Sequence, residues 1–133
     1  MSTPSLVAVK SGDKIKGIYV HYDGNSEYMK ENLKEYFNTY EKAMQLIELG
    51  DMSGIAGDLE ACKKEAYYYK AYHVDSYNHM QKEIEQDKNC FKAKEFDSVV
   101  AAHNYAKDND LQFYLYDGDW KKEDFEYNYL EII

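Results

Sequence analysis

Alternating hydrophobic and polar residues predict a strand that organises the N-terminal half of the chain. It runs from Lys14 to Gly24, and its isoleucine, valine and tyrosine residues suit a half-buried, pleated surface. Gly12-Asp13 before it and Gly24-Asn25 after it are turn signals. A second apolar run, Ser5 to Lys10, precedes the first turn, so the two runs predict a β-hairpin.

Side chains alternate between the two faces of a strand, which divides this stretch into two sets. Ile18, Val20 and Tyr22 share one face. Tyr19, His21 and Asp23 share the other, so an imidazole and a carboxylate two residues apart are expected to point the same way. This pair is the most chemically specific feature of the pattern.

Apolar residues at helical spacing predict three helices. Ser26 is a suitable N-cap for the first, and Thr39 for the second, which ends near Gly50 after a kink at Asn38-Thr39. Asp97 is expected to cap the third helix, over 98–107. Tyr77 to Lys88 is read as a polar helix or a long excursion.

The remaining segments predict further strands. Glu65 to Asp75 is rich in tyrosine and is read as a strand after a glycine-containing loop over 51–60. Phe91 to Phe96 is a short strand, and Leu111 to Tyr116 alternates cleanly. The Asp117-Gly118 turn signal follows, and alternation returns over 125–130.

These elements predict one α+β domain over residues 1–133. The sheet is mostly antiparallel, is built from an N-terminal and a C-terminal hairpin, and has helices packed on one face. A chain of 133 residues with 44% hydrophobic residues is long enough for one core.

The charge narrows the classes of partner. The formal net charge is -9, and all 16 basic residues are lysines. Nucleic-acid binding needs clustered Lys and Arg for phosphate contacts, so direct binding to nucleic acid is not expected. An acidic chain favours a basic partner.

The N-terminal residues and the length of the apolar runs indicate in which cellular compartment the protein is expected. Met1 to Lys10 has no basic region followed by an apolar run, so no signal peptide is expected, and no run is long enough to span a membrane. A cytosolic protein is expected. Cys62 and Cys90 should then be reduced rather than joined in a disulfide.

Several motifs together resemble a family of small proteins common in phages and prophages. The motifs are S-L-V-A-V at 5–9, K-G-I-Y-V-H-Y-D-G at 16–24, L-G-D at 49–51, A-Y-H-x-D at 71–75, K-E-F at 94–96 and Y-L-Y-D-G-D-W at 114–120. They cover most of the chain except 76–93. Within this group, the chain is similar to zinc-containing anti-CRISPR inhibitors of type II RNA-guided nucleases.

The resemblance implies a phage-derived antagonist of host defence that binds the effector nuclease in the host cytoplasm, blocks nucleic-acid loading and catalyses nothing. One departure stands out. The family often carries arginines around the second histidine, in an H-R-D-R string, whereas this chain has His73-Val74-Asp75-Ser76. Any function that depends on those arginines would be missing here.

A structural zinc site is the first candidate for chemistry. Zinc takes four Cys, His or carboxylate ligands in a tetrahedron. The chain offers His21 and Asp23 from one strand, His73 from a second expected strand, and Cys62 or Cys90. The alternative is that His21 is a sheet histidine that donates to Asp23. His79 and His103 are read as loop or helix residues.

The acidic C-terminal segment is the second candidate. From Asp108 to Ile133 there are eight acids and two lysines. Aromatic residues between the acids are typical interface anchors, and carboxylates at a turn present negative charge to a basic groove. The expected partner-binding residues are Tyr114, Tyr116, Asp117, Asp119, Trp120, Glu123, Asp124 and Glu126. An ordinary solvated hairpin is the alternative, with the interface on the helices between Ser26 and Gly50.

Three functions remain in competition. The leading hypothesis is a non-catalytic inhibitor that binds a basic surface of a host defence nuclease. The second is a small metal-dependent hydrolase acting on a nucleotide or phosphoester, although the chain has no nucleophile elbow, glycine-rich phosphate loop or H-E-x-x-H motif. The third is a phage accessory protein that binds another phage protein.

Overall fold

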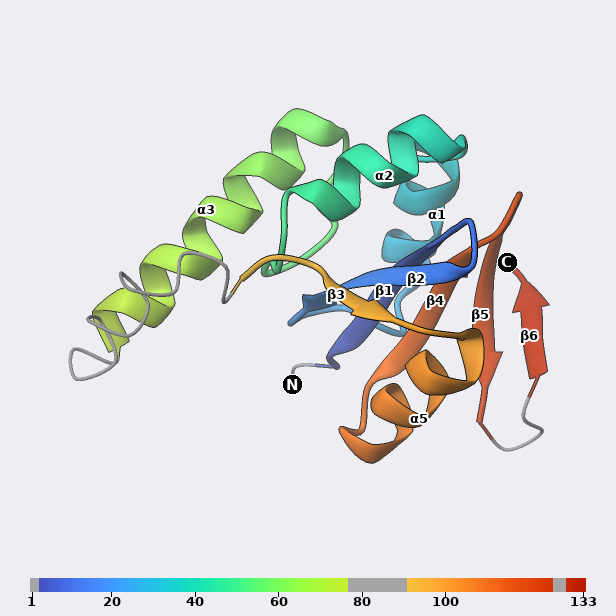
Figure 1. Ribbon diagram of the computed structural model, residues 1–133. Helices are drawn as coiled ribbons and strands as arrows, with labels where there is room; N and C mark the ends of the chain where they lie inside the picture. The colour runs from blue at the N-terminus through green and yellow to red at the C-terminus, as the bar shows by residue number, and fades with distance from the viewer. Residues whose placement is uncertain (1–2, 77–90, 126–128) are drawn as a thin grey trace.

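The computed structural model describes residues 3–76, 91–125 and 129–133 (Figure 1). The elements follow one another along the chain with these bounds: β1 Ser5–Ser11, β2 Lys14–Val20, α1 Glu27–Tyr36, α2 Tyr40–Glu48, α3 Leu59–Ser76, β3 Lys94–Phe96, α5 Val99–Asp108, β4 Gln112–Tyr116, β5 Trp120–Asp124 and β6 Tyr129–Ile132.

One six-stranded sheet, in the order β3-β2-β1-β4-β5-β6, holds the fold together. The N-terminal hairpin forms as predicted, with Ser11 paired to Lys14 across the Gly12-Asp13 turn. The C-terminal hairpin of β4 and β5 turns at Asp117–Asp119. The two hairpins meet where β1 runs parallel to β4, the one parallel pair in an otherwise antiparallel sheet among the described strands.

Helices cover both faces of this sheet (Figure 1). The α+β class is confirmed, but the expectation that all helices lie on one face is not. Alternate residues of β1 divide the core: Val7 and Val9 face α1, α2 and the start of α3, whereas Leu6 and Ala8 face α5. A central strand that is apolar on both sides requires a cover on both sides.

Serine and threonine side chains cap three of the described helices, two of them at the residues that the sequence indicated. The Ser26 side chain accepts a hydrogen bond from the Met29 amide, and Thr39 accepts one from Lys42. The cap of α5 is Ser98 rather than the neighbouring Asp97, which instead pairs with Lys14 at 2.6 Å. A hydroxyl at the N-cap satisfies an amide that has no partner within the helix.

The predicted strand over Glu65 to Asp75 is wrong, because this segment belongs to helix α3. Asp58 caps the helix: its carboxylate accepts from the Ala61 amide at 3.0 Å. Cys62 and Ala66, four residues apart, are buried against the core. The run Tyr67–Tyr69 resembles a strand in composition, but the surrounding alanine, lysine and glutamate residues favour a helix and the tertiary contacts decide.

The C-terminal strands differ from the prediction in their bounds. The turn at Gly118 is followed by β5, which the alternation did not indicate, and β6 shares only Tyr129 and Leu130 with the strand expected over 125–130. Residues 126–128 and the segment Tyr77 to Lys88 lie outside the described residues. None of the described helices is long and apolar enough to cross a membrane.

Trp120 is a central part of the larger core cluster and generates a stability prediction. It is 1% exposed, and its indole Nε1 donates to the Phe37 carbonyl at 2.9 Å. Trp120→Ala leaves a cavity and removes the donor from a buried carbonyl, so the free energy of unfolding should fall by about 3–5 kcal/mol.

Urea denaturation measures this loss. The matched control is Ile132→Ala on β6, where the side chain is 64% exposed and the change should stay within about 0.5 kcal/mol. Equal denaturation midpoints for the Trp120 variant and the unmodified chain would contradict the packing described above.

Candidate functional site

The end of strand β2 is fixed by a backbone segment from the loop after α2. Met52 forms a parallel bridge with Val20. The His21 amide donates to the Met52 carbonyl at 3.1 Å, and the Tyr22 amide donates to the Ser53 carbonyl at 2.8 Å. Because these bonds continue the ladder beyond the last strand residue, Tyr22 leaves the sheet in a defined direction.

The next residue, Asp23, turns the chain through a left-handed conformation with φ of 63°. Its carbonyl accepts from the Ser26 amide at 3.0 Å and from the Ser26 hydroxyl at 2.9 Å. Asp is one of the few non-glycine residues that tolerate this region. The turn therefore connects β2 directly to the cap of α1.

Gly24 anchors the turn to the body of the fold. Its amide donates to the Thr3 carbonyl at 2.7 Å, and its carbonyl accepts from the Tyr114 hydroxyl at 2.6 Å. A Cβ at this position would lie 2.4 Å from the Thr3 carbonyl oxygen, so only glycine fits. Burial raises the pKa of Tyr114, which keeps its hydroxyl protonated as the donor.

A groove of about 290 Å³ opens beside this turn. We call it the acidic groove and define it by its lining residues: Tyr22, Asp23, Tyr28, Ser53, Gly54, Ile55, Ala56 and Glu65. Its two tyrosines are 50% and 56% exposed, and the two Asp or Glu side chains in its lining, Asp23 and Glu65, are its only acidic or basic residues. The groove thus combines aromatic surface with negative charge and has no cation in its lining.

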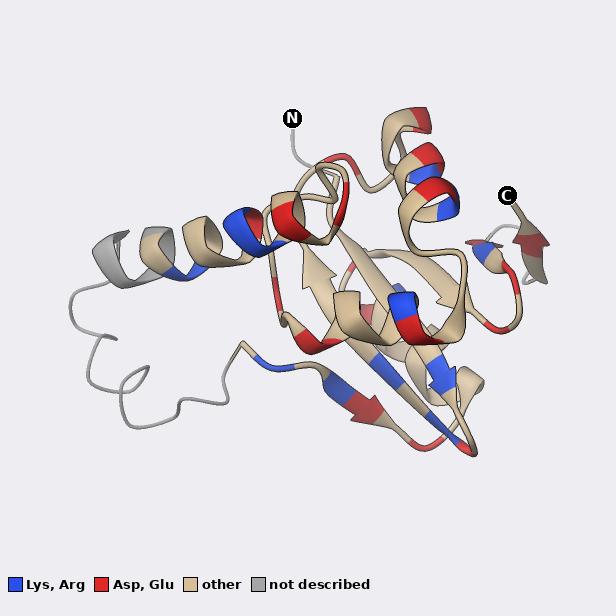
Figure 2. Cartoon of the chain, turned by 90° about the horizontal axis from the view of Figure 1, so that it is seen from above, with Lys and Arg blue, Asp and Glu red and all other residues tan. Residues whose placement is uncertain are grey.

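Helix α1 carries the acidic surface outward from the groove. Tyr28, Glu31 and Glu35 follow the i, i+3, i+7 spacing that places residues on one helix face, and all three are exposed. Asn32, beside them, fixes the helix to the groove wall by donating to the Ile55 carbonyl at 3.0 Å. Figure 2 shows carboxylate positions alternating with lysine positions along α1 and again at the start of α3.

A half-buried carboxylate lies behind the end of β2. Asp51 Oδ1 accepts from the Tyr19 amide at 2.9 Å. Burial raises the pKa of Asp51 from 3.8 to about 6, against the opposing effects of the Tyr19 hydrogen bond and of Lys94 and Lys70. Asp51 therefore titrates close to neutral pH and was not singled out by the sequence pattern, which placed it in a loop.

The expected histidine–carboxylate pair at the end of β2 does not form. His21 shares a face with Tyr19 as predicted, but its Nδ1 lies 2.8 Å from the Tyr19 hydroxyl rather than beside Asp23. Asp23 leaves the strand geometry because β2 ends at Val20. The simple alternation of faces does not extend to residues 22 and 23.

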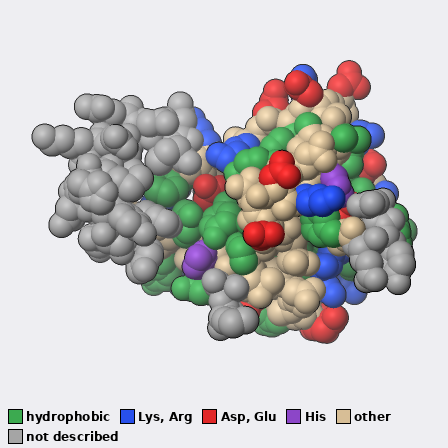
Figure 3. Space-filling view, turned by 90° about the horizontal axis from the view of Figure 1, so that it is seen from below, with side chains coloured by type: hydrophobic (Ala, Val, Ile, Leu, Met, Phe, Trp, Pro, Cys, Tyr) green, Lys and Arg blue, Asp and Glu red, His purple; other side chains and the backbone are tan. Residues whose placement is uncertain are grey.

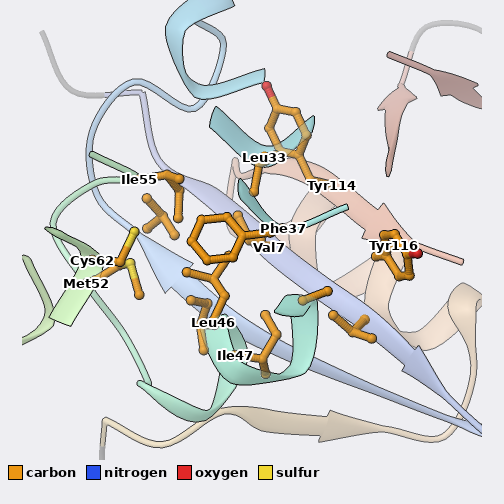
Figure 4. Packing of buried hydrophobic residues seen from close by; sticks show 14 of the residues in the cluster. Val7, Leu33, Phe37, Leu46, Ile47, Met52, Ile55, Cys62, Tyr114 and Tyr116 are labelled. Atoms are coloured by element: carbon orange, nitrogen blue, oxygen red, sulfur yellow. The ribbon is translucent and has the colours of Figure 1, made fainter. Parts of the chain in front are cut away.

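Cys62, a predicted zinc ligand, is a core residue (Figure 4). It is fully buried near Met52 and Ile55, and its thiol donates to the Gly57 carbonyl at 3.8 Å. Burial raises the pKa of the thiol to about 11. Zinc binds the thiolate, whereas burial in the apolar core favours the protonated thiol in the metal-free chain.

The other two zinc candidates are only partly placed. The backbone of His73 lies in α3 rather than in a strand, its side chain lies outside the described residues, and so do Cys90 and His79. Within residues 3–76, 91–125 and 129–133, no group of three or more His, Cys, Asp or Glu side chains could hold a metal ion. The zinc site stays a prediction.

The aromatic residues expected to bind a partner are core residues instead. Tyr114, Tyr116 and Trp120 are buried in the cluster with Val7 and Phe37, so they are not available to another protein. Aromatic side chains are large enough to fill the space between the sheet and its helices. The number of aromatic residues near the turn does not show whether they fill that space or face the solvent.

The acids expected beside them have separate environments. Asp117 and Asp119 are exposed at the hairpin turn, and Asp117 lies 3.9 Å from Lys10. Asp124 is half-buried. Glu126 lies outside the described residues. Among the described residues of the predicted hairpin surface, Asp117 and Asp119 are the exposed ones.

Glu123 is buried beneath α5, where its carboxylate lies 2.5 Å from His103 Nδ1. The two residues line a shallow groove of about 250 Å³ with Val99, Val100, Tyr129 and Leu130. The sequence reading missed this pair, because Glu123 appeared as one more surface acid and His103 as an ordinary helix residue. A carboxylate on the inward face of β5, opposite a helix histidine, is the signal that would have indicated it.

The comparisons with known proteins add no relative. No family model, no curated protein and no solved structure matches this chain. The function must therefore be inferred from the residues of the acidic groove and its surroundings.

The raised pKa of Asp51 generates a pH-dependent prediction. Its pKa is about 6 when folded and near 3.8 when exposed, so the proton binds more tightly to the folded chain. The stability that this provides is complete below pH 4 and is lost between pH 4 and 6. Asp51→Asn keeps an oxygen for the Tyr19 amide and carries no charge, so it should stabilise the chain by about 2–3 kcal/mol at pH 7.

Urea denaturation of both proteins from pH 4 to pH 7 measures the difference. The stability gained by the asparagine variant should grow with pH and level off above pH 6. A difference that stays constant over this range would contradict the burial of an ionised Asp51.

Proposed function

We propose that this chain is a non-catalytic inhibitor that binds a basic, nucleic-acid-binding surface of a host type II RNA-guided nuclease. The acidic groove and the exposed carboxylates along α1 would be the contact surface. We infer the nuclease as partner from the resemblance of the sequence to phage-encoded anti-CRISPR inhibitors. We infer the kind of contact, between carboxylates and a basic surface, from the acidic groove.

The observation that carries the proposal is the lining of the acidic groove. It presents two exposed tyrosines and two carboxylates with no lysine among them, although the chain has 16 lysines. Tyrosine is enriched in protein interfaces, where it provides large contact area for little lost conformational entropy. Carboxylates around it would repel nucleic acid and attract a basic protein surface.

The opposite face of the molecule supports this choice. Figure 3, seen from below, shows carboxylates and lysines in several places among other side chains on that face. On the helix side, Glu31 and Glu35 extend the negative charge away from the groove. Lys30 and Lys34 lie on the same helix, so the net charge of α1 is close to balanced and the contact would depend on the face that carries Glu31 and Glu35.

The chemistry of the described residues favours binding over catalysis. The Cys62 thiol is buried and protonated, so it is not an activated nucleophile. The His103–Glu123 pair resembles a base with an orienting carboxylate, but the side chains that line its groove include no Ser, Thr or Cys that could serve as the nucleophile. Absence of catalysis stays a prediction.

Inhibition by this route depends on electrostatic attraction. A basic channel would bind the acidic chain in place of guide or target nucleic acid, and mobile ions would weaken the attraction between exposed charges beyond about 8–10 Å. The strength of the complex should therefore fall as the salt concentration rises.

Matched charge reversals test which surface makes the contact. Glu31→Lys with Glu35→Lys changes the charge along α1, and Asp117→Lys with Asp119→Lys changes it equally at the hairpin turn. All four side chains are exposed, so both variants should fold. We expect the α1 double variant to weaken binding and inhibition at least tenfold, and the turn variant to change them less than threefold.

The measurement is nuclease cleavage and complex formation with purified effector at low, physiological and high salt, with circular dichroism to verify folding. Salt-independent binding, or inhibition unchanged in the folded α1 variant, would contradict the proposal. A larger loss in the turn variant would return the interface to the hairpin.

A further inference from the structure

We propose that the acidic groove receives one lysine or arginine side chain of the partner, held between the Tyr22 and Tyr28 rings and neutralised by Asp23 and Glu65. The inference rests on the proposed function, since it names the group that the basic partner inserts. It makes a specific claim about one groove rather than about overall charge.

The chemistry of the lining selects a cation. A positive group is attracted to the face of an aromatic ring, and two carboxylates beside the rings add direct charge pairing. Asp23 and Glu65 would repel a phosphate or carboxylate ligand, so nucleotides and acidic peptides are excluded. Neutral ligands would leave both carboxylates without a counter-charge.

The size of the groove fits one side chain. Its volume of about 290 Å³ lies at the lower limit of the roughly 300–1,000 Å³ found for small-molecule sites. Ala56 and the exposed rings of Tyr22 and Tyr28 can contact the aliphatic stem of a long basic side chain while its charged end reaches the carboxylates.

The groove is already shaped for this purpose. Hydrogen bonds of the Tyr22 amide to Ser53 and of the Gly24 amide to Thr3 fix the backbone on both sides of Asp23. The Tyr28 hydroxyl donates to the Ala56 carbonyl at 3.3 Å, which orients its ring against the far wall. Since the backbone of the site is set before binding, less conformational entropy is lost when the cation enters.

The left-handed backbone at Asp23 fixes where its carboxylate leaves the chain. Asp is one of the few non-glycine residues that tolerate a φ of 63°. A glycine would adopt this conformation as well but would remove the carboxylate from the groove.

A peptide titration tests the inference without the nuclease. Blocked glycine–alanine peptides with a single central arginine or lysine are added to protein carrying ¹³C-labelled tyrosine rings. The controls are the same peptide with neutral citrulline or norleucine at the centre. We expect saturable shifts of the Tyr22 and Tyr28 ring signals with the cationic peptides only.

Variants locate the binding to the groove. Tyr22→Leu and Asp23→Asn should each raise the peptide dissociation constant roughly three- to tenfold. Asparagine tolerates the left-handed backbone, so the Asp23 variant should keep its fold. The matched control is Tyr67→Leu, which changes an exposed tyrosine of α3 that does not line the groove.

The outcomes separate this inference from the proposed function. Cation-selective shifts that both groove variants weaken support the inference even if the nuclease does not bind. Equal shifts with citrulline, no saturable shift of Tyr22 or Tyr28, or unchanged affinity in the groove variants would overturn it, even if the nuclease is inhibited.

Discussion

The parallel pairing of β1 with β4 is the constraint on which the rest of the structure depends. It joins two hairpins from opposite ends of the chain into one sheet, from Ser5 beside Gln112 to Val9 beside Tyr116. Both strands are buried on both faces, so each supplies residues to two cores at once. Helix α5 then packs against strands of both hairpins, β2 and β4.

The same pairing determines the shape of the candidate site. Tyr114 on β4 reaches across the core to the Gly24 carbonyl, 90 positions earlier in the chain. Its hydrogen bond holds the turn that directs Tyr22 and Asp23 outward. The acidic groove is therefore a surface feature whose geometry is set by the buried sheet.

Local signals in the sequence predicted those parts of the fold that local interactions decide. The Gly12-Asp13 turn, the Ser26 and Thr39 caps and the clean alternation over Leu111 to Tyr116 each depend on neighbouring residues, and each forms as expected. The tyrosine-rich segment around Tyr67–Tyr69 did not, because side-chain type alone does not separate an exposed helix face from a strand.

The candidate site was harder to predict because it depends on long-range contacts. The pattern singled out His21 and Asp23 but placed them in a strand that ran to Gly24, and it expected a metal-binding pair there, whereas β2 ends at Val20. It could not show that Met52 extends the end of β2 or that Tyr28 and Glu65 converge on Tyr22. The pairing of His103 with Glu123 was hidden for the same reason, since only the packing of α5 on the sheet brings the two together.

Hydrogen–deuterium exchange of the chain alone and in complex with purified type II effector tests the central claim most directly. If a basic partner surface occupies the acidic groove, the amides of residues 21–32 and 53–56 should become protected on binding, while those of the 117–119 turn should not change. Protection confined to the 117–119 turn, or no protection in a complex that is demonstrably formed, would contradict the account.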